Sequence, residues 1–361
     1  MRSGLVFLII GVLVAVLPMR GEGYAPARLL GDPSLSYPAD LRARGRSGIV
    51  VVEWIVGVDG RPQDVIVVGR FGASGFVNAA LRAIDEFRFD PARLDGVPVA
   101  SAWRQVFTFE LVEDASEPDA DPILTTGTRS FRTRYARILA DIEAGNFARA
   151  DRRLNGMLAR ADLDLPAHAH LRLVESLLAE RMGDPERRLY ALDWALMRDG
   201  RWLHGELRYD ALSWRLKAQL ELQRLGDAFQ SVETALRLAP EHTERAAWQR
   251  LRERLVELMH GDDTFDVSIL VGADRDGHET GFAHYRPLRQ AFGLVEIQGD
   301  VSTVEIRCAT MFGRFEARLE RAWRLPDGSR DCVVWIFGGV GSQVRLREYG
   351  DAIGVAESSD D

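Results

Sequence analysis

The chain has 361 residues, of which 46% are hydrophobic and 28% are charged, and its formal net charge is −8. This length suggests two or three domains, and the composition is that of a globular protein rather than a disordered one. The acidic balance argues against a nucleic-acid-binding protein, because such proteins need a basic surface.

The N-terminus begins with Arg2 and an apolar run over residues 5–17. A short positive segment followed by such a run predicts a secretory signal peptide, here residues 1–23. The run is shorter than the roughly 20 apolar residues that span a bilayer as a helix. Arg20 and Glu22 stand where a cleavage site would have small residues. A short N-terminal anchor therefore stays open as the alternative.

The first globular region is expected over residues 34–112. Its pattern predicts strand, strand, helix and strand, at residues 49–58, 65–68, 76–84 and 106–111. Asp59-Gly60 lies between the first two strands and is typical of a hairpin turn. This order predicts an α+β domain with an antiparallel sheet.

The same region contains a Val-Asp-Gly-Arg turn at residues 58–61 and the run FRFDPARLDGVPV at residues 87–99. Its distinctive residues are Tyr37, Pro38, Gly48, Asp59, Gly60, Phe89, Pro91 and Gly96. Together, in this order and spacing, they resemble the motif of the C-terminal domain of the TonB energy-transducer family.

The resemblance implies a periplasmic domain of a Gram-negative bacterium. It also implies that the domain binds an extended partner segment, which adds a strand to one edge of the sheet. By family position the edge is the closing strand, with residues Val106, Phe107, Thr108, Phe109, Glu110 and Leu111.

Residues 113–128 are acidic and contain proline and glycine, so we expect a linker. Residues 129–261 are expected to be helical. Gly145, Gly183 and Gly226 each precede small and large apolar residues. This spacing resembles degenerate tetratricopeptide repeats, which stack into concave surfaces that bind peptides or proteins. The third copy departs from the pattern, and a plain helical bundle joining two β domains is the alternative.

An all-β domain is expected over residues 264–350, followed by a disordered tail at residues 351–361. Strand-like segments with gaps rich in glycine support this prediction. Cys308 and Cys332 are the two cysteines of the chain. In an exported protein they predict a disulfide, which would contribute roughly 3 kcal/mol. Two unrelated buried thiols are the alternative.

The sequence contains no recognisable set of catalytic residues. His278 and His284 flank Glu279 in a segment with several glycines, but their spacing matches no established metal site. We therefore expect no catalytic residue, no metal and no cofactor.

Three functions follow. The first is a periplasmic adaptor that binds protein partners, such as an outer-membrane receptor or another envelope protein, and no nucleic acid. The second is a TonB-type energy transducer that couples the proton gradient to outer-membrane transport, with inner-membrane contact only if the N-terminal segment is retained. The apolar run at residues 5–17 lacks a polar coupling residue, which argues against this function. The third is an enzyme in the C-terminal domain.

Overall fold

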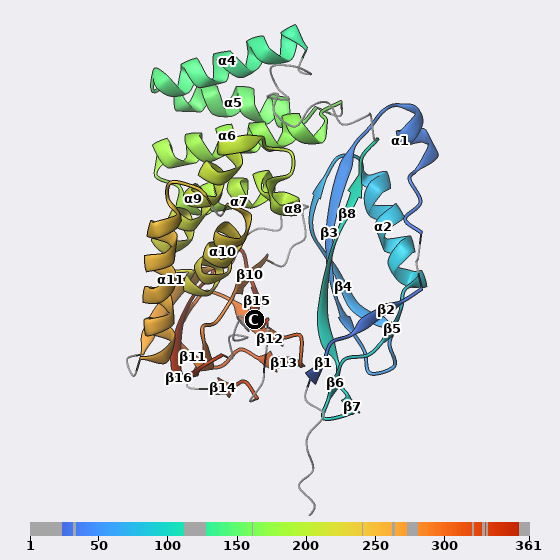
Figure 1. Ribbon diagram of the computed structural model, residues 1–361, viewed down its shortest axis with the longest axis vertical. Coiled ribbons are helices and arrows are strands. Elements are labelled where there is room, and N and C mark those ends of the chain that lie inside the picture. Colours follow the sequence, from blue (N-terminus) through green and yellow to red (C-terminus); the bar gives the residue numbers. More distant parts are fainter. Residues whose placement is uncertain are drawn as a thin grey trace, which may run out of the picture.

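Figure 1 shows the computed structural model of the chain. It describes residues 24–31, 34–111, 128–160, 162–239, 241–261, 264–272, 281–319, 321–326, 329 and 331–353. The predicted signal peptide, most of the predicted linker and residues 354–361 lie outside this part.

The helical region begins at Arg129, where it was expected to begin. Thr128 before it caps the first helix, because its Oγ1 accepts a hydrogen bond from the Phe131 amide at 3.2 Å. One predicted boundary was wrong. Asp351 and Ala352, expected in a disordered tail, belong to the last strand.

The N-terminal domain is built on a three-stranded antiparallel sheet, in which β3 lies between β4 and β8. These strands are β3 (Gly48–Val56), β4 (Pro62–Phe71) and β8 (Ser101–Phe109). Helix α2 (Ser74–Glu86) covers one face of the sheet (Figure 1). The predicted order of strand, strand, helix and strand is confirmed.

Short elements complete this domain. They are β1 (Tyr24–Ala25), β2 (Arg28–Leu30), α1 (Ala39–Ala43), β5 (Arg88–Asp90), β6 (Arg93–Leu94) and β7 (Val97–Pro98). Strand β2 pairs with β5, and β6 pairs with both β1 and β7.

The central strand β3 is buried on both faces, which explains its nearly unbroken apolar sequence. Val50, Val52 and Trp54 belong to the core under α2. Ile49 and Val51 point to the opposite face and join the core of the helical region. The second face of the sheet is therefore covered by the same chain.

The helical region packs its helices in antiparallel pairs (Figure 1). The helices are α4 (Arg129–Glu143), α5 (Phe147–Leu158), α6 (Leu165–Met182), α7 (Pro185–Ala195), α8 (Met197–Gly200), α9 (Gly205–Glu221), α10 (Leu225–Leu238) and α11 (Arg245–His260). Among the described residues, no helix combines the length and the apolar character needed to cross a bilayer.

The turns of three helix pairs share a backbone feature. Gly145 and Gly183 have φ values of +72° and +70° and lie two residues before the second helix of their pair. In the third pair this place is taken by Gln223, with φ of +55°. Gly226, expected to form that turn, lies inside α10 instead, so this prediction was wrong.

Gly226 has a different role, which explains why it resembled a turn glycine. A Cβ at this position would lie 2.1 Å from the carbonyl oxygen of Arg286 in the C-terminal domain. The glycine therefore permits a close approach between two domains. Whether the helix pairs are tetratricopeptide repeats stays a prediction.

The C-terminal domain is a pair of four-stranded antiparallel sheets that share one core. The strands are β9 (Phe265–Leu270), β10 (Gly281–Tyr285), β11 (Arg289–Gln298), β12 (Val301–Arg307), β13 (Phe312–Glu316), β14 (Ala322–Arg324), β15 (Val333–Gly338) and β16 (Gln343–Ala352). Cys308 and Cys332 form a disulfide between the end of β12 and the start of β15, so the predicted bond is confirmed.

The N-terminal domain is joined to the helical region by an aromatic contact. The ring of Phe71 on β4 stacks on His168 of α6, with ring centroids 3.9 Å apart. Trp194 of α7 meets the same histidine edge-on at 5.6 Å. Burial lowers the pKa of His168 well below its ordinary value, and the neighbouring Arg172 cation adds to this effect.

Acid should therefore weaken this interface. Above pH 6.5 the histidine is neutral in both states, but below it the unfolded chain takes up a proton that the folded protein resists. We expect His168 to cost about 1.4 kcal/mol of stability per pH unit as the pH falls from 6.5 towards 5. Urea unfolding of the wild type and His168→Gln over this range measures the effect. The other histidines are common to both proteins, so equal pH slopes would contradict the expectation.

Candidate functional site: the edge of strand β8

The family-motif residues form two groups, one near each end of the N-terminal sheet. The Tyr37 hydroxyl donates a hydrogen bond to the Arg46 carbonyl, and its ring meets Phe76 and Phe109 edge-on at 5.7 and 5.6 Å. Pro38 precedes α1. The opening of the motif therefore fixes the chain against the core under α2.

Two glycines of the motif permit close contacts. A Cβ on Gly48 would lie 2.3 Å from the Phe76 ring. Gly60 has φ of +74° in the turn after β3, and its carbonyl accepts the Phe89 amide at 2.8 Å. Asp59 accepts the Arg61 amide within the same turn at 3.1 Å. These contacts give the three residues a part in the packing and turn geometry of the domain.

The remaining motif residues surround the segment from β5 to β7. Pro91 follows β5 directly. Asp95 and Gly96 have φ values of +50° and +80° and form a tight turn between β6 and β7. Asp and Gly suit this turn because both tolerate positive φ.

Strand β8 is one edge of the sheet, since its only strand partner among the described residues is β3. The Ala102 amide donates to the Cys308 carbonyl at 2.9 Å, so it points away from β3. In an antiparallel pair the outward direction recurs at every second residue. The amides and carbonyls of Arg104, Val106 and Thr108 therefore also point outward.

These three outward amides are available for pairing. Within the described ranges, none of them donates to a backbone carbonyl outside the sheet. The side chain of Arg104 is exposed, and those of Val106 and Thr108 are partly buried. The Thr108 hydroxyl is buried and has no hydrogen-bond partner there. The edge thus offers three successive donor and acceptor pairs.

Other parts of the chain close both ends of this edge. At the start of β8, the Cys308 carbonyl accepts the hydrogen bond of the Ala102 amide, so this amide cannot pair with an added strand. Just beyond its end, Glu110 accepts the Trp202 indole N–H at 3.0 Å and pairs with Arg201 at 3.7 Å. A partner segment that adds along β8 is thereby limited to the stretch from Arg104 to Thr108.

The six residues predicted for the edge divide into three groups. Val106 and Thr108 present their backbone outward, and Phe107 and Phe109 bury their rings in the core under α2. Glu110 and Leu111 follow the end of β8 at Phe109, so their assignment to the strand was wrong. The prediction did not include Arg104, although its backbone belongs to the same outward series. Only the register between β3 and β8 shows that the backbone of Arg104 faces outward, because this register decides which alternate residues of β8 do so.

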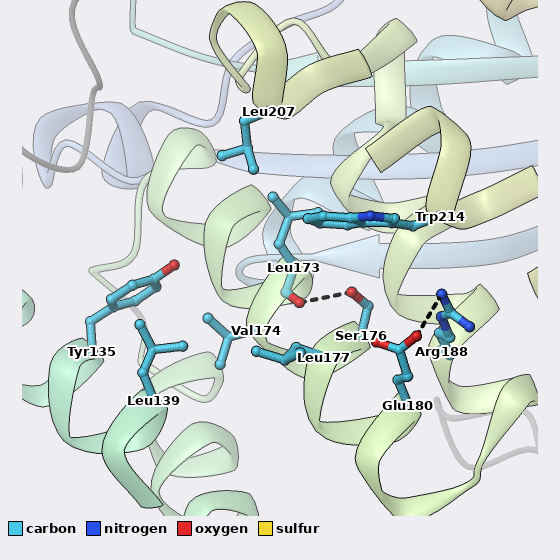
Figure 2. Close-up of a pocket in the computed structure, with 10 residues that line it drawn as sticks. All are labelled: Tyr135, Leu139, Leu173, Val174, Ser176, Leu177, Glu180, Arg188, Leu207 and Trp214. Atoms are coloured by element: carbon cyan, nitrogen blue, oxygen red, sulfur yellow. Dashed lines mark hydrogen bonds and ion pairs between the residues drawn. The ribbon is translucent and has the colours of Figure 1, made fainter. Parts of the chain in front are cut away.

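A second feature is an apolar groove in the helical region (Figure 2). It has a volume of about 170 Å³ and is lined by Tyr135, Leu139, Leu173, Val174, Ser176, Leu177, Glu180, Arg188, Leu207 and Trp214. An ion pair of 3.1 Å between Glu180 and Arg188 lies at one end. Helices α4, α6 and α9 supply its apolar lining, which can hold small apolar groups.

No metal site emerges from the described part of the chain. Among those residues, no group of three or more His, Cys, Asp or Glu side chains could hold an ion. His278 and Glu279 lie outside the described residues. His284 is on β10, 5.9 Å from the Trp335 ring.

Comparisons with known proteins concern the N-terminal domain. Residues 33–111 match the family model described as Gram-negative bacterial TonB protein C-terminal. A solution NMR structure of the Pseudomonas aeruginosa TonB CTD is 26% identical, over 25% of this chain and 92% of that chain, with a TM-score of 0.23. A search of curated proteins found no match. The chain therefore carries a TonB-like C-terminal domain at residues 33–111, joined to a helical region and a β-rich region.

Proposed function

We propose that this protein is a periplasmic adaptor that binds an extended segment of another envelope protein by strand addition to β8. The observation that carries the proposal is the outward backbone of Arg104, Val106 and Thr108 at the edge of the sheet. Strand addition requires such an edge, because the partner gains its affinity from main-chain hydrogen bonds.

The expected free energy of the backbone hydrogen bonds gives only weak or moderate affinity, so side-chain contacts must add to it. Three outward residues offer about six hydrogen bonds to an added strand. Each contributes only about 1 kcal/mol net, since the same groups bind water beforehand. Ordering the partner segment opposes part of this gain. Specificity must therefore come from side chains beside the edge.

The periplasmic location has two supports. The family matched by residues 33–111 is Gram-negative bacterial. The Cys308–Cys332 disulfide also favours an oxidising compartment such as the periplasm. The predicted signal peptide would deliver the chain there.

The packing of the TonB-like domain favours an adaptor over an energy transducer. Ile49 and Val51 are buried in the core of the helical region, and Phe71 stacks on His168. The C-terminal domain also contacts this domain, since the Tyr24 hydroxyl on β1 donates to the Ala309 carbonyl at 2.8 Å. Transducing force to an outer-membrane receptor requires a docking domain that can be pulled, and here the domain is fixed to its neighbours.

Replacing Val106 with proline tests the proposal. Proline removes one outward amide but no hydrogen bond to β3, and edge strands tolerate it at such positions. Val106→Ala is the matched control, because it trims the side chain and keeps the amide. With a photo-crosslinking amino acid in place of Arg104, we expect a cross-linked envelope protein in cells, reduced about tenfold by Val106→Pro and not by Val106→Ala.

A second crosslinking position separates edge binding from general proximity. Gln63 is exposed on β4, the opposite edge of the sheet. The same partner captured equally well from Gln63, or undiminished capture by the proline variant, would refute strand addition at β8.

A further inference from the structure

A polar cavity of about 660 Å³ lies beside β8, where the three parts of the chain meet. Arg104 and Val106 line it from the TonB-like domain, and His284 and Arg286 line it from the C-terminal domain. The segment from α7 to α10 supplies the remaining wall, which includes Asp193, Arg198, Arg215, Gln219 and Arg224. None of these residues belongs to the family motif.

Arginine dominates the charge of this cavity, with six arginines against three aspartates in its lining. Four of the arginines have a carboxylate partner in the described structure. The pairs are Arg104–Glu53, Arg201–Glu110, Arg224–Glu186 and Arg286–Asp227, at 2.9, 3.7, 2.7 and 3.6 Å. Arg198 and Arg215 have no such partner within the described ranges, so the cavity retains unpaired positive charge.

Two buried polar atoms on α9 lack partners. The Nε of Arg215 is a donor without an acceptor, and the Oε1 of Gln219, one turn later, is an acceptor without a donor. The Gln219 side chain is more than nine-tenths buried. Such atoms are costly to leave unsatisfied, and together they complement a peptide group or a carboxylate next to an N–H.

The backbone near the cavity is strained. Arg198 and Asp199 have φ values of +55° and +59° in α8, between α7 and α9. Non-glycine residues in this region cost of order 1 kcal/mol each and are enriched at binding sites. The conformation places Arg198 on the cavity wall.

The other titratable groups of the wall offset this charge only in part. Burial raises the pKa of Asp193 and the nearby Arg215 cation opposes this rise, so Asp193 offsets part of the Arg215 charge. Asp199 pairs at 3.6 Å with Arg237, which lies outside the cavity lining. Burial also lowers the pKa of His284 to about 4, so this histidine is neutral at ordinary pH. The unpaired arginines are therefore the main charges that a ligand would meet.

We infer that this cavity receives acidic side chains, aspartate or glutamate, of the partner segment that adds to β8. The inference rests on the proposed function. Side chains of an added strand alternate between two faces, and those on one face extend on the same side of the sheet as Arg104 and Val106. Carboxylates on that face can reach Arg198 and Arg215, and charge-assisted hydrogen bonds of this kind are about twice as strong as neutral ones.

Binding of two synthetic heptapeptides to the full protein tests this. In one, valine and glutamate alternate, and in the other glutamine replaces glutamate; both are blocked at their ends. We expect the glutamate peptide to bind at least about tenfold more tightly, measured by calorimetry. Arg215→Gln and the exposed Arg198→Gln should each remove most of this preference. Arg254→Gln, an exposed change on α11 outside the cavity, should leave it intact.

The Val106→Pro variant separates this inference from the proposed function. Suppose that the two peptides bind the wild type with equal affinity and that neither binds Val106→Pro. This result would support strand addition at β8 and contradict the preference for acidic side chains. A glutamate preference that survives Val106→Pro would contradict strand addition, as would failure of both peptides to bind. Succinate binding as tightly as the glutamate peptide would show a small-molecule site instead and overturn the inference.

Discussion

Replacing Arg307 with methionine should lower the free energy of unfolding by about 3 kcal/mol. Arg307 is 1% exposed and binds the buried carboxylate of Glu305 through two nitrogens, at 2.9 and 2.6 Å. Its guanidinium also lies over the Trp335 ring, 4.7 Å from the centroid. Removing the cation leaves Glu305 buried with less compensation. Urea denaturation of both proteins measures the loss.

Arg314 provides a matched control for this change. It pairs with the other oxygen of Glu305 at 2.6 Å, but about half of its side chain is exposed to solvent. Arg314→Met should therefore cost about 1 kcal/mol or less. A double change of Glu305 and Arg307 to methionine should recover part of the loss, because no uncompensated charge remains. Equal losses for Arg307→Met and Arg314→Met would contradict this view.

The Arg307 result bears on how the domains are joined. Its guanidinium is 3.8 Å from Glu53 of β3, which also pairs with Arg104 of β8. One ionic network, buried at Arg307 and exposed at Arg104, therefore connects the C-terminal domain to the sheet that carries the proposed binding edge. The Arg307→Met change should therefore also make the position of strand β8 less well fixed.

Replacing Gly60 with alanine should cost about 3 kcal/mol. The residue has φ of +74°, and a Cβ there would lie 2.1 Å from the Phe89 carbonyl oxygen. That oxygen belongs to the backbone and cannot rotate away as a flexible side chain could. The substitution must therefore displace the turn after β3 or the segment at β5.

Gly145→Ala measures the cost of a positive φ without the steric clash that occurs at Gly60. Gly145 has nearly the same φ, +72°, but a Cβ there meets no atom within 4 Å. We expect it to cost about 1 kcal/mol, the price of left-handed backbone alone. Thermal or urea unfolding compares the two variants. A loss for Gly60→Ala no greater than that for Gly145→Ala would show that the contact with Phe89 is unimportant.

Local sequence signals predicted much of the TonB-like domain. Asp59-Gly60 indicated the turn after the first strand, because few residues adopt the positive φ that Gly60 has. The apolar run of β3 predicted a strand, but it did not reveal that the second face lies against helices. That contact depends on Phe71 meeting His168, residues almost a hundred positions apart.

The candidate site was less predictable. Gly226 resembled a turn glycine, but its small size serves a contact with Arg286 of another domain. The cavity brings Arg104, Arg215 and His284 together from three regions. Each of these residues is ordinary in its own segment, so only the packing of the three parts reveals the site.

Amide hydrogen exchange at single-residue resolution tests strand addition most directly. In the free protein, the amides of Arg104, Val106 and Thr108 should exchange faster than those of Gln105 and Phe107, which point towards β3. Adding the partner captured by crosslinking should protect the three outward amides. Unchanged exchange at all three while the partner is bound would contradict strand addition at β8.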